Sequence, residues 1–402
     1  MELLLRHLAR RVGMRVLKQL RHPALIRAAQ TLRNTPPSGE PALPRHAVKT
    51  GLDWVVGDRS SNQIKVTPGT PTPVQVHTLD PQIHWRFREA PSLMNADTYL
   101  LRLPEGNVVR EPGHVVTADQ TILGDLSREW YFEAAEHSLL FCRSLPPVRR
   151  IPGTSATIAI SSGGTYYHWL LESLPRLGIL EKAGVPVSSL GKIIMNEGGG
   201  AFQGELLDML GIPESQRLFT GRQTHFQCET LLAPSLPGNV GYTPKWAVDF
   251  IRDKLLPKTG ASGNPKRIYI SRGAARYRKV LNEPEVMDCL AEHGFTPVTL
   301  EQLPFAKQVE LFAGAEAVVA PHGAGLSNLA FCPHGVKVVE MFAPKYVNPC
   351  YGVLSQAVAA EYWYLLGSGE RPADGEDPHL VEQSMQIPVQ ALEQTLKASG
   401  LA

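Results

Sequence analysis

The feature that most constrains this fold is a repeated alternation of short apolar runs and amphipathic stretches. In the first series, the apolar runs predict strands at 156–160, 192–196 and 229–235. The amphipathic stretches between and after them predict helices at 166–177, 204–210 and 245–256. In the second series, strands are predicted at 267–271, 296–300, 316–321 and 336–342. Helices are predicted at 283–294, 305–315 and 325–332, the first of them capped by Asn282. Such alternation predicts α/β units with parallel sheets covered on both faces.

The punctuation between these runs predicts the domain organisation, and 402 residues are too many for one ordinary core. We expect a linker at 34–46, an N-terminal domain over 47–259 and a C-terminal Rossmann-like domain over 260–366, ending in a loop and helix at 367–402. The N-terminal domain divides into a β-rich part, 47–150, and a Rossmann-like part, 151–259. Two doubly wound halves would leave a cleft at the carboxyl ends of their strands.

Residues 1–33 form a strongly basic arm. They carry eight Arg and Lys residues against one Glu, which gives +7 where the whole chain has only +2. Leu5, Leu8 and Val12 begin a helical apolar spacing, so the arm is predicted to be an amphipathic helix lying on an anionic membrane surface. A helix packed on the body and a targeting presequence are the alternatives. The acidic remainder argues against nucleic-acid binding.

The remaining composition bounds the class of protein. Five cysteines lie without CxxC spacing, which favours a reducing compartment over a disulfide framework or a zinc site. No Asp-x-Asp pair, which could hold a divalent metal, occurs in the chain. If the protein binds a diphosphate ligand, it would therefore have to do so without a metal. We therefore expect no cofactor, and a cytoplasmic protein attached peripherally to the inner face of the cytoplasmic membrane.

The stretch VVAPHGAGLSNLAFCPHGVKVVEMF, 318–342, is a candidate anion site. Gly323 and Gly325 would let a ligand approach the backbone, and the following helix start would offer free N–H groups to a diphosphate. His322, Ala324 and Asn328 belong to the same turn. Glu340 ends the next strand and could accept ribose hydroxyls. An ordinary glycine-rich turn fits this segment alone equally well.

Two further groups could serve the same cleft. Arg272 follows a strand end and Arg278 lies in the next loop, where their guanidinium groups could clamp phosphate. His168 and Glu172 are four residues apart on one helix face and suit a general base and its partner, with Tyr167 and Trp169 on the acceptor side. A solvated basic loop and a simple surface pair are the alternatives.

Taken together, residues 267–342 and the helix YYHWLLESLPRL, 166–177, resemble glycosyltransferase family 61. The resemblance implies a GT-B architecture and inverting, metal-independent transfer of a sugar from a nucleotide diphosphate donor, most commonly UDP. It suggests a glycan or lipid-linked acceptor in capsule, exopolysaccharide or lipopolysaccharide assembly. One departure is Thr165, where the family often has Asn.

The resemblance also implies roles for the residues above. Arg272, Arg278 and the turn from His322 to Gly325 would hold the diphosphate, and Glu340 the ribose. Glu172 would take the proton of the acceptor hydroxyl with His168 orienting it, or His168 would be the base itself. An inactive nucleotide- or glycan-binding protein and a nucleotide-sugar epimerase are the rival functions.

Overall fold

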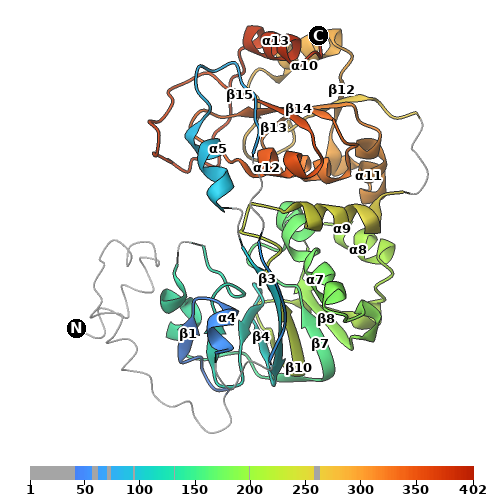
Figure 1. The fold of residues 1–402 in the computed structure, drawn as a ribbon. Helices are drawn as coiled ribbons and strands as arrows, with labels where there is room; N and C mark the ends of the chain where they lie inside the picture. Colours follow the sequence, from blue (N-terminus) through green and yellow to red (C-terminus); the bar gives the residue numbers. More distant parts are fainter. Residues whose placement is uncertain are drawn as a thin grey trace.

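The computed structural model of this chain describes residues 41–56, 62–69, 74–93, 96–130, 132–198, 200–257 and 263–402, which form two α/β lobes (Figure 1). The basic arm, 1–33, and most of the linker lie outside the described residues. Within them, no helix is both long and apolar enough to cross a membrane.

The second lobe is built on a five-stranded sheet in which every neighbouring pair is parallel. Its strands, in spatial order, are β12 (Thr296–Val298), β11 (Arg267–Ile270), β13 (Ala317–Pro321), β14 (Lys337–Phe342) and β15 (Glu361–Leu366). The alternation of side chains is clear in β13, where Val318 and Val319 belong to different hydrophobic clusters. Both faces of the sheet are therefore buried, as predicted for a parallel sheet.

Helices cover both faces of this sheet (Figure 1). The side of Val319 is covered by α10 (Glu283–Glu292) and α13 (Val389–Ala398), and that of Val318 by α11 (Phe305–Ala313) and α12 (Cys350–Ala357). Asn282 precedes α10 but does not cap it with its side chain, because its amide bonds the backbone of Ile387 instead.

The strand order fixes where a ligand site can form. From β11 the chain runs to the edge strand β12 and then returns to β13 on the other side of β11. Connections therefore leave β11 and β13 on opposite faces, and the carboxyl ends of these two strands flank a crevice. Arg272 follows β11 and His322 follows β13, so the topology brings both candidate residues to this point.

The first lobe contains a ten-stranded mixed sheet rather than a purely doubly wound unit. Its parallel part is β10 (His225–Pro234), β7 (Arg149–Thr157), β8 (Lys192–Asn196) and β9 (Arg217–Thr220). Strands β3 (Thr98–Pro104) and β4 (Asn107–Val109) pair antiparallel with β10. The remaining strands are β1 (His46–Val48), β2 (Gln63–Thr67), β5 (His114–Val116) and β6 (Thr121–Leu123). The predicted β-rich and Rossmann-like parts thus share one sheet through β10, and a GT-B arrangement stays a prediction.

Residues 74–93 depart from the predicted domain division. His77 exchanges backbone hydrogen bonds with Tyr362 and Tyr364 at 2.8 and 2.9 Å, which places it beside β15 of the second lobe. In the following helix α5 (Trp85–Glu89), the Phe87 ring stacks on Tyr364 at 4.8 Å. Part of the predicted N-terminal domain therefore belongs to the second lobe (Figure 1). Burial of the Phe87 side chain favours the packing of this segment on the second lobe.

The two lobes share an apolar core. Trp169 of the first lobe belongs to the same buried cluster as Leu329 and Leu354 of the second. Helix α9 (Lys245–Leu255) lies at this boundary, where Arg252 donates hydrogen bonds to the carbonyl oxygens of Ala330 and Cys332 at 2.8 and 2.6 Å. The lobes are therefore packed together here.

A buried arginine ties the helices of the first lobe to its sheet. Arg176, which opens α7 (Arg176–Lys182), donates from Nε to the Pro234 carbonyl at 3.0 Å and from Nη1 to the Ala159 carbonyl at 2.8 Å. Its full burial lowers the pKa of the guanidinium from 12.5 to about 9. These bonds fix the segment carrying His168 against the carboxyl ends of β10 and β7.

Candidate active site

His168 and Glu172 lie at a change of helix type. Helix α6 (Tyr166–His168) leads directly into one π-helical turn, Trp169–Ser173, in which Leu174 N donates to Trp169 O at 2.9 Å. Such π turns occur mostly as single insertions and often at functional sites. The predicted pairing is confirmed, because His168 Nδ1 lies 2.7 Å from Glu172 Oε2.

The surroundings give the two side chains different positions. Glu172 is 3% exposed, and its second oxygen accepts a 2.7 Å hydrogen bond from Gly241 N. The side chain of His168 is 19% exposed. With Nδ1 bonded to the buried carboxylate, the imidazole is held in a fixed orientation and its Nε2 is the atom left for a substrate.

The Arg272 side chain lies against Gly323, beyond the carboxyl ends of β11 and β13. A Cβ added to Gly323 would lie 1.9 Å from Arg272 Nη1, so the absence of a side chain at Gly323 makes room for the guanidinium. The φ angle of Gly323 is 175°, an extended value open to any residue. The group that approaches Gly323 is Arg272, and unusual backbone angles play no part, so the predicted approach of a ligand to this glycine stays a prediction.

The guanidinium groups of Arg272 and Arg278 bond mainly to backbone carbonyls. Arg272 donates to the Tyr277 carbonyl at 3.0 Å, but its Nε is buried without a partner. Arg278 donates to the carbonyls of His322 and Val381 at 3.0 and 2.8 Å. Neither forms an ion pair with a carboxylate among the described residues. Burial, and then the charge of Arg278, lower the pKa of Arg272.

Glu340 orients His322. Its Oε1 lies 2.5 Å from His322 Nδ1, and its Oε2 accepts a hydrogen bond from the Tyr362 hydroxyl. Burial raises the pKa of Glu340 well above its usual value and, with Arg278 and Arg272, lowers that of His322. We assign a neutral pair, in which the carboxylic acid donates to Nδ1 and the proton of His322 sits on Nε2.

This arrangement disagrees with the ribose role predicted for Glu340. The side chain is fully buried and both oxygens already have protein partners, so a ribose could reach it only by breaking those bonds. Strand polarity placed Glu340 correctly at a carboxyl edge, but the inward direction of its side chain depends on the pleat. The geometry supports positioning of His322 instead.

The turn after His322 starts a 3₁₀ helix, Ala324–Phe331, rather than the expected α-helix. Asn328 is buried and accepts from the Tyr166 hydroxyl at 2.7 Å, while its amide donates to Gln308 and to the Gly325 carbonyl, both at 3.1 Å. Asn328 thus connects the lobes. That Asn328, Ala324 and Gly325 contact a nucleotide-sugar donor stays a prediction.

Aromatic rings connect the two candidate halves. The Tyr167 ring lies 5.2 Å from His168 and 5.6 Å from Tyr351, and the Tyr351 ring lies 5.2 Å from His322. The structure therefore links His168 to His322 through a chain of ring contacts, and the acceptor-side and donor-side roles of these groups stay predictions. Spacing gives no signal for Tyr351, because it enters the site only through packing of α12.

Trp169 does not belong to the acceptor side, contrary to prediction. Its side chain is fully buried, and its ring lies 6.4 Å from that of Phe202 within the core. The π-helical turn begins at this residue and directs it inward.

This chain is similar to known proteins over part of its length. Residues 166–339 match the family model described as Glycosyltransferase 61, a range that includes His168, Glu172, Arg272 and His322. The EGF domain-specific O-linked N-acetylglucosamine transferase of Drosophila melanogaster is 28% identical over 151 residues, covering 35% of this chain and 29% of that protein. Protein O-linked-mannose beta-1,4-N-acetylglucosaminyltransferase 2 of Canis lupus familiaris is 41% identical over 105 residues, covering 25% and 18%. The chain thus spans less than a third of the length of each of these relatives.

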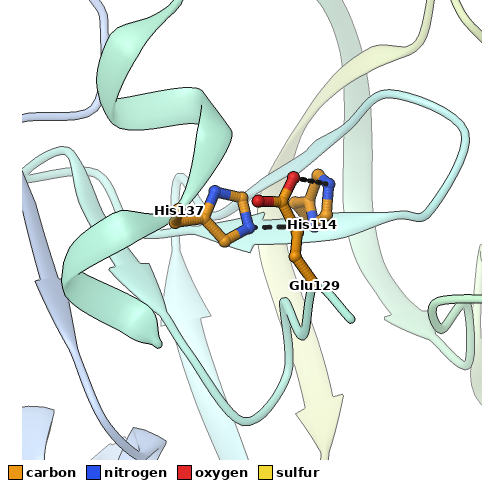
Figure 2. Close-up of side chains that lie close together, drawn as sticks. All are labelled: His114, Glu129 and His137. Atoms are coloured by element: carbon orange, nitrogen blue, oxygen red, sulfur yellow. Dashed lines mark hydrogen bonds and ion pairs between the residues drawn. The ribbon is translucent and has the colours of Figure 1, made fainter. Parts of the chain in front are cut away.

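A separate cluster in the first lobe contains potential metal ligands. One ligand atom each of His114, Glu129 and His137 lies within 4.8 Å of the others (Figure 2). Protein groups already use them: His137 Nδ1 accepts from Leu139 N at 3.2 Å, so its Nε2 donates to Ser127 O at 2.7 Å. Because both nitrogens of His137 are occupied, a metal would have to displace existing hydrogen bonds. The geometry fits a hydrogen-bonded network better.

This network predicts a loss of stability in acid. Burial, and then the nearby His137, lower the pKa of His114 from 6.5 to about 3, so His114 stays neutral when folded and binds a proton below pH 6.5 only when unfolded. The free energy of unfolding should therefore fall as the pH drops from 6.5 towards 3. Urea titrations should show a shallower fall for His114→Gln, whereas the exposed His46→Gln should keep the wild-type slope. Equal slopes would contradict the assignment.

Proposed function

Because the chain contains a glycosyltransferase family 61 domain over residues 166–339, we propose that it transfers a sugar from a nucleotide diphosphate donor to a saccharide hydroxyl without a metal ion. One observation carries the donor half of this proposal. Arg272, with a buried Nε that lacks a partner, and Arg278 lie near each other beyond the carboxyl ends of β11 and β13, and neither forms an ion pair with a carboxylate in the part of the chain that the structure describes. A diphosphate supplies the missing negative charge.

The transfer step is an inverting displacement at the anomeric carbon. His168 Nε2 accepts the proton of the acceptor hydroxyl, while Glu172 orients the ring and stabilises the imidazolium that forms. The acceptor oxygen bonds the anomeric carbon as the bond to the diphosphate oxygen breaks. Arg272, Arg278 and the Nε2–H of His322 stabilise the leaving nucleotide in place of a metal.

The sugar and the acceptor are chosen for testing on similarity. Both relatives described above are named for transfer of N-acetylglucosamine, so UDP-N-acetylglucosamine is the first donor to test. For the acceptor we propose a glycan or lipid-linked saccharide of a cell-surface polysaccharide such as capsule or lipopolysaccharide, made at the cytoplasmic face of a membrane.

Arg272→Ala tests the donor site. Arg272→Ala should lower kcat by about 10²–10³, because it removes one preorganised donor to the leaving group. UDP binding by calorimetry should weaken as well, while the thermal midpoint stays near that of the wild type. Arg276→Ala is the matched control, since Arg276 is exposed in the same loop. Near-normal turnover in Arg272→Ala would overturn the donor assignment.

Glu172→Gln tests the proton transfer. The amide keeps the shape of the side chain but cannot stabilise an imidazolium, so transfer should fall by about 10²–10⁴. UDP affinity should be unchanged, because Glu172 lies on the acceptor side. Full transfer activity would move the base elsewhere. Wild-type UDP binding without turnover, across a panel of donors and acceptors, would favour the rival binding protein.

Attachment to a membrane is proposed for residues 1–33. A variant lacking them should lose co-sedimentation with vesicles in which about three in ten lipids are anionic, because anionic headgroups attract the basic side chains of the arm. High salt should release the full-length chain in the same assay, since surface charges are screened. Undiminished sedimentation of the shortened variant would refute the anchor.

A further inference from the structure

We propose that Trp130, together with Arg128, forms a platform that binds a pyranose ring of the acceptor. This inference rests on the proposed function and names a subsite for it. Trp130 lies after β6, outside the family-matched residues, and it is 38% exposed. A tryptophan exposed to this degree offers a broad apolar surface whose burial by a ligand is favourable.

The platform adjoins the proposed base. The Trp130 ring lies 5.7 Å from the His168 ring, and Trp130, Arg128 and Glu172 line one small pocket. A sugar resting on Trp130 would therefore have hydroxyl groups near His168.

The order of contacts assigns Trp130 to the acceptor rather than to the donor. Trp130 meets His168, which meets Tyr167, and only beyond Tyr167 and Tyr351 does the path reach His322. Trp130 thus contacts the proposed base directly, whereas two further rings, Tyr167 and Tyr351, connect that base to His322. A direct displacement needs the acceptor on the side of the base, which is where the platform lies.

Hydrogen bonds with Ser161 and Ser162 hold the platform in place. Trp130 Nε1 donates to Ser162 Oγ at 2.8 Å, and Ser161 Oγ donates to the Arg128 carbonyl. Ser162 has φ of +64°, a left-handed conformation that costs energy in a residue with a side chain. Two glycines follow at once, yet a hydroxyl-bearing residue occupies the strained position. The hydrogen bond from Trp130 needs a hydroxyl group at this position, which a glycine would not supply.

Hydrogen bonds to other parts of the first lobe also hold this segment, whose Glu129 lies beside His114 and His137 (Figure 2). The Ser127 carbonyl accepts from His137 Nε2 at 2.7 Å, and Ser127 Oγ accepts from Val115 N at 2.8 Å. Glu129 accepts from Ser138 N at 2.8 Å. Residues 127–130 are thereby anchored on both sides of Arg128, and a preordered surface binds without a cost for ordering it.

The chemistry of the exposed groups fits a saccharide. The C–H face of a pyranose packs on an aromatic ring, while its hydroxyls need polar partners at the edge. The Arg128 guanidinium lies over the Trp130 ring, 5.3 Å from its centroid, so a sugar would pack on the part of the ring that Arg128 leaves uncovered. Arg128 is itself exposed, and its N–H groups can donate to the hydroxyls of that sugar.

Saturation-transfer NMR with the methyl glycosides of glucose, galactose, mannose and xylose tests the platform. In the full-length protein, at least one glycoside should give a signal, and Trp130→Ala should weaken it by about threefold or more. Trp130→Phe should retain most of it. Phe219→Ala is the matched control, because Phe219 is a similarly exposed aromatic residue on β9. Trp130→Leu replaces the alanine variant if that variant unfolds.

Calorimetry with UDP on the same samples separates this inference from the proposed function. Retained UDP binding with a weakened glycoside signal in Trp130→Ala supports the platform. A glycoside signal that is absent in the wild type, or equal in Trp130→Ala, overturns the platform while the donor site stands. Loss of UDP binding in Trp130→Ala would also overturn it, by placing Trp130 on the donor side.

Discussion

The constraint on which the candidate site depends is the reversal of strand order at β11 and β13. The chain leaves β11 for the edge and comes back to its other side, so two consecutive connections cover opposite faces of the sheet. The strand ends that flank this reversal cannot both be covered by the same helix. Arg272 and His322 follow those strands directly, and their proximity is therefore a property of the topology. Gly323 completes it by leaving room for the guanidinium.

Packing between the lobes turns this crevice into one half of a larger site. The shared apolar core fixes the second lobe against the segment that carries His168, and Tyr166 hydrogen bonds across the boundary to Asn328. Tyr167 and Tyr351 fill the space between the two histidines. The spacing between His168 and His322 is thus set by the volume of these two aromatic side chains. Changes in that volume would alter the distance between the two proposed halves of the site.

The sequence predicts the second lobe well, because apolar periodicity fixes which segments are strands and helices, and parallel order follows from their alternation. It also predicts the contact of His168 with Glu172, which depends only on local spacing. Features that rest on side-chain direction or distant packing are out of reach. The inward turn of Glu340, the burial of Trp169 and the passage of residues 74–93 to the second lobe belong to this group. Trp130 is missed for the same reason, since it meets Ser162 and His168 only in the folded chain.

The π-helical turn at Trp169–Ser173 has a consequence for how one helical segment faces two neighbours. One residue added to a helical turn rotates everything that follows by about 100° relative to what precedes it. Tyr166 and Tyr167, before the turn, face the second lobe, whereas Arg176, after it, faces the strand ends of the first. A regular α-helix through the same residues would point one of these sets away from its partners. The phase shift lets a single short segment join both lobes and present His168 at their junction.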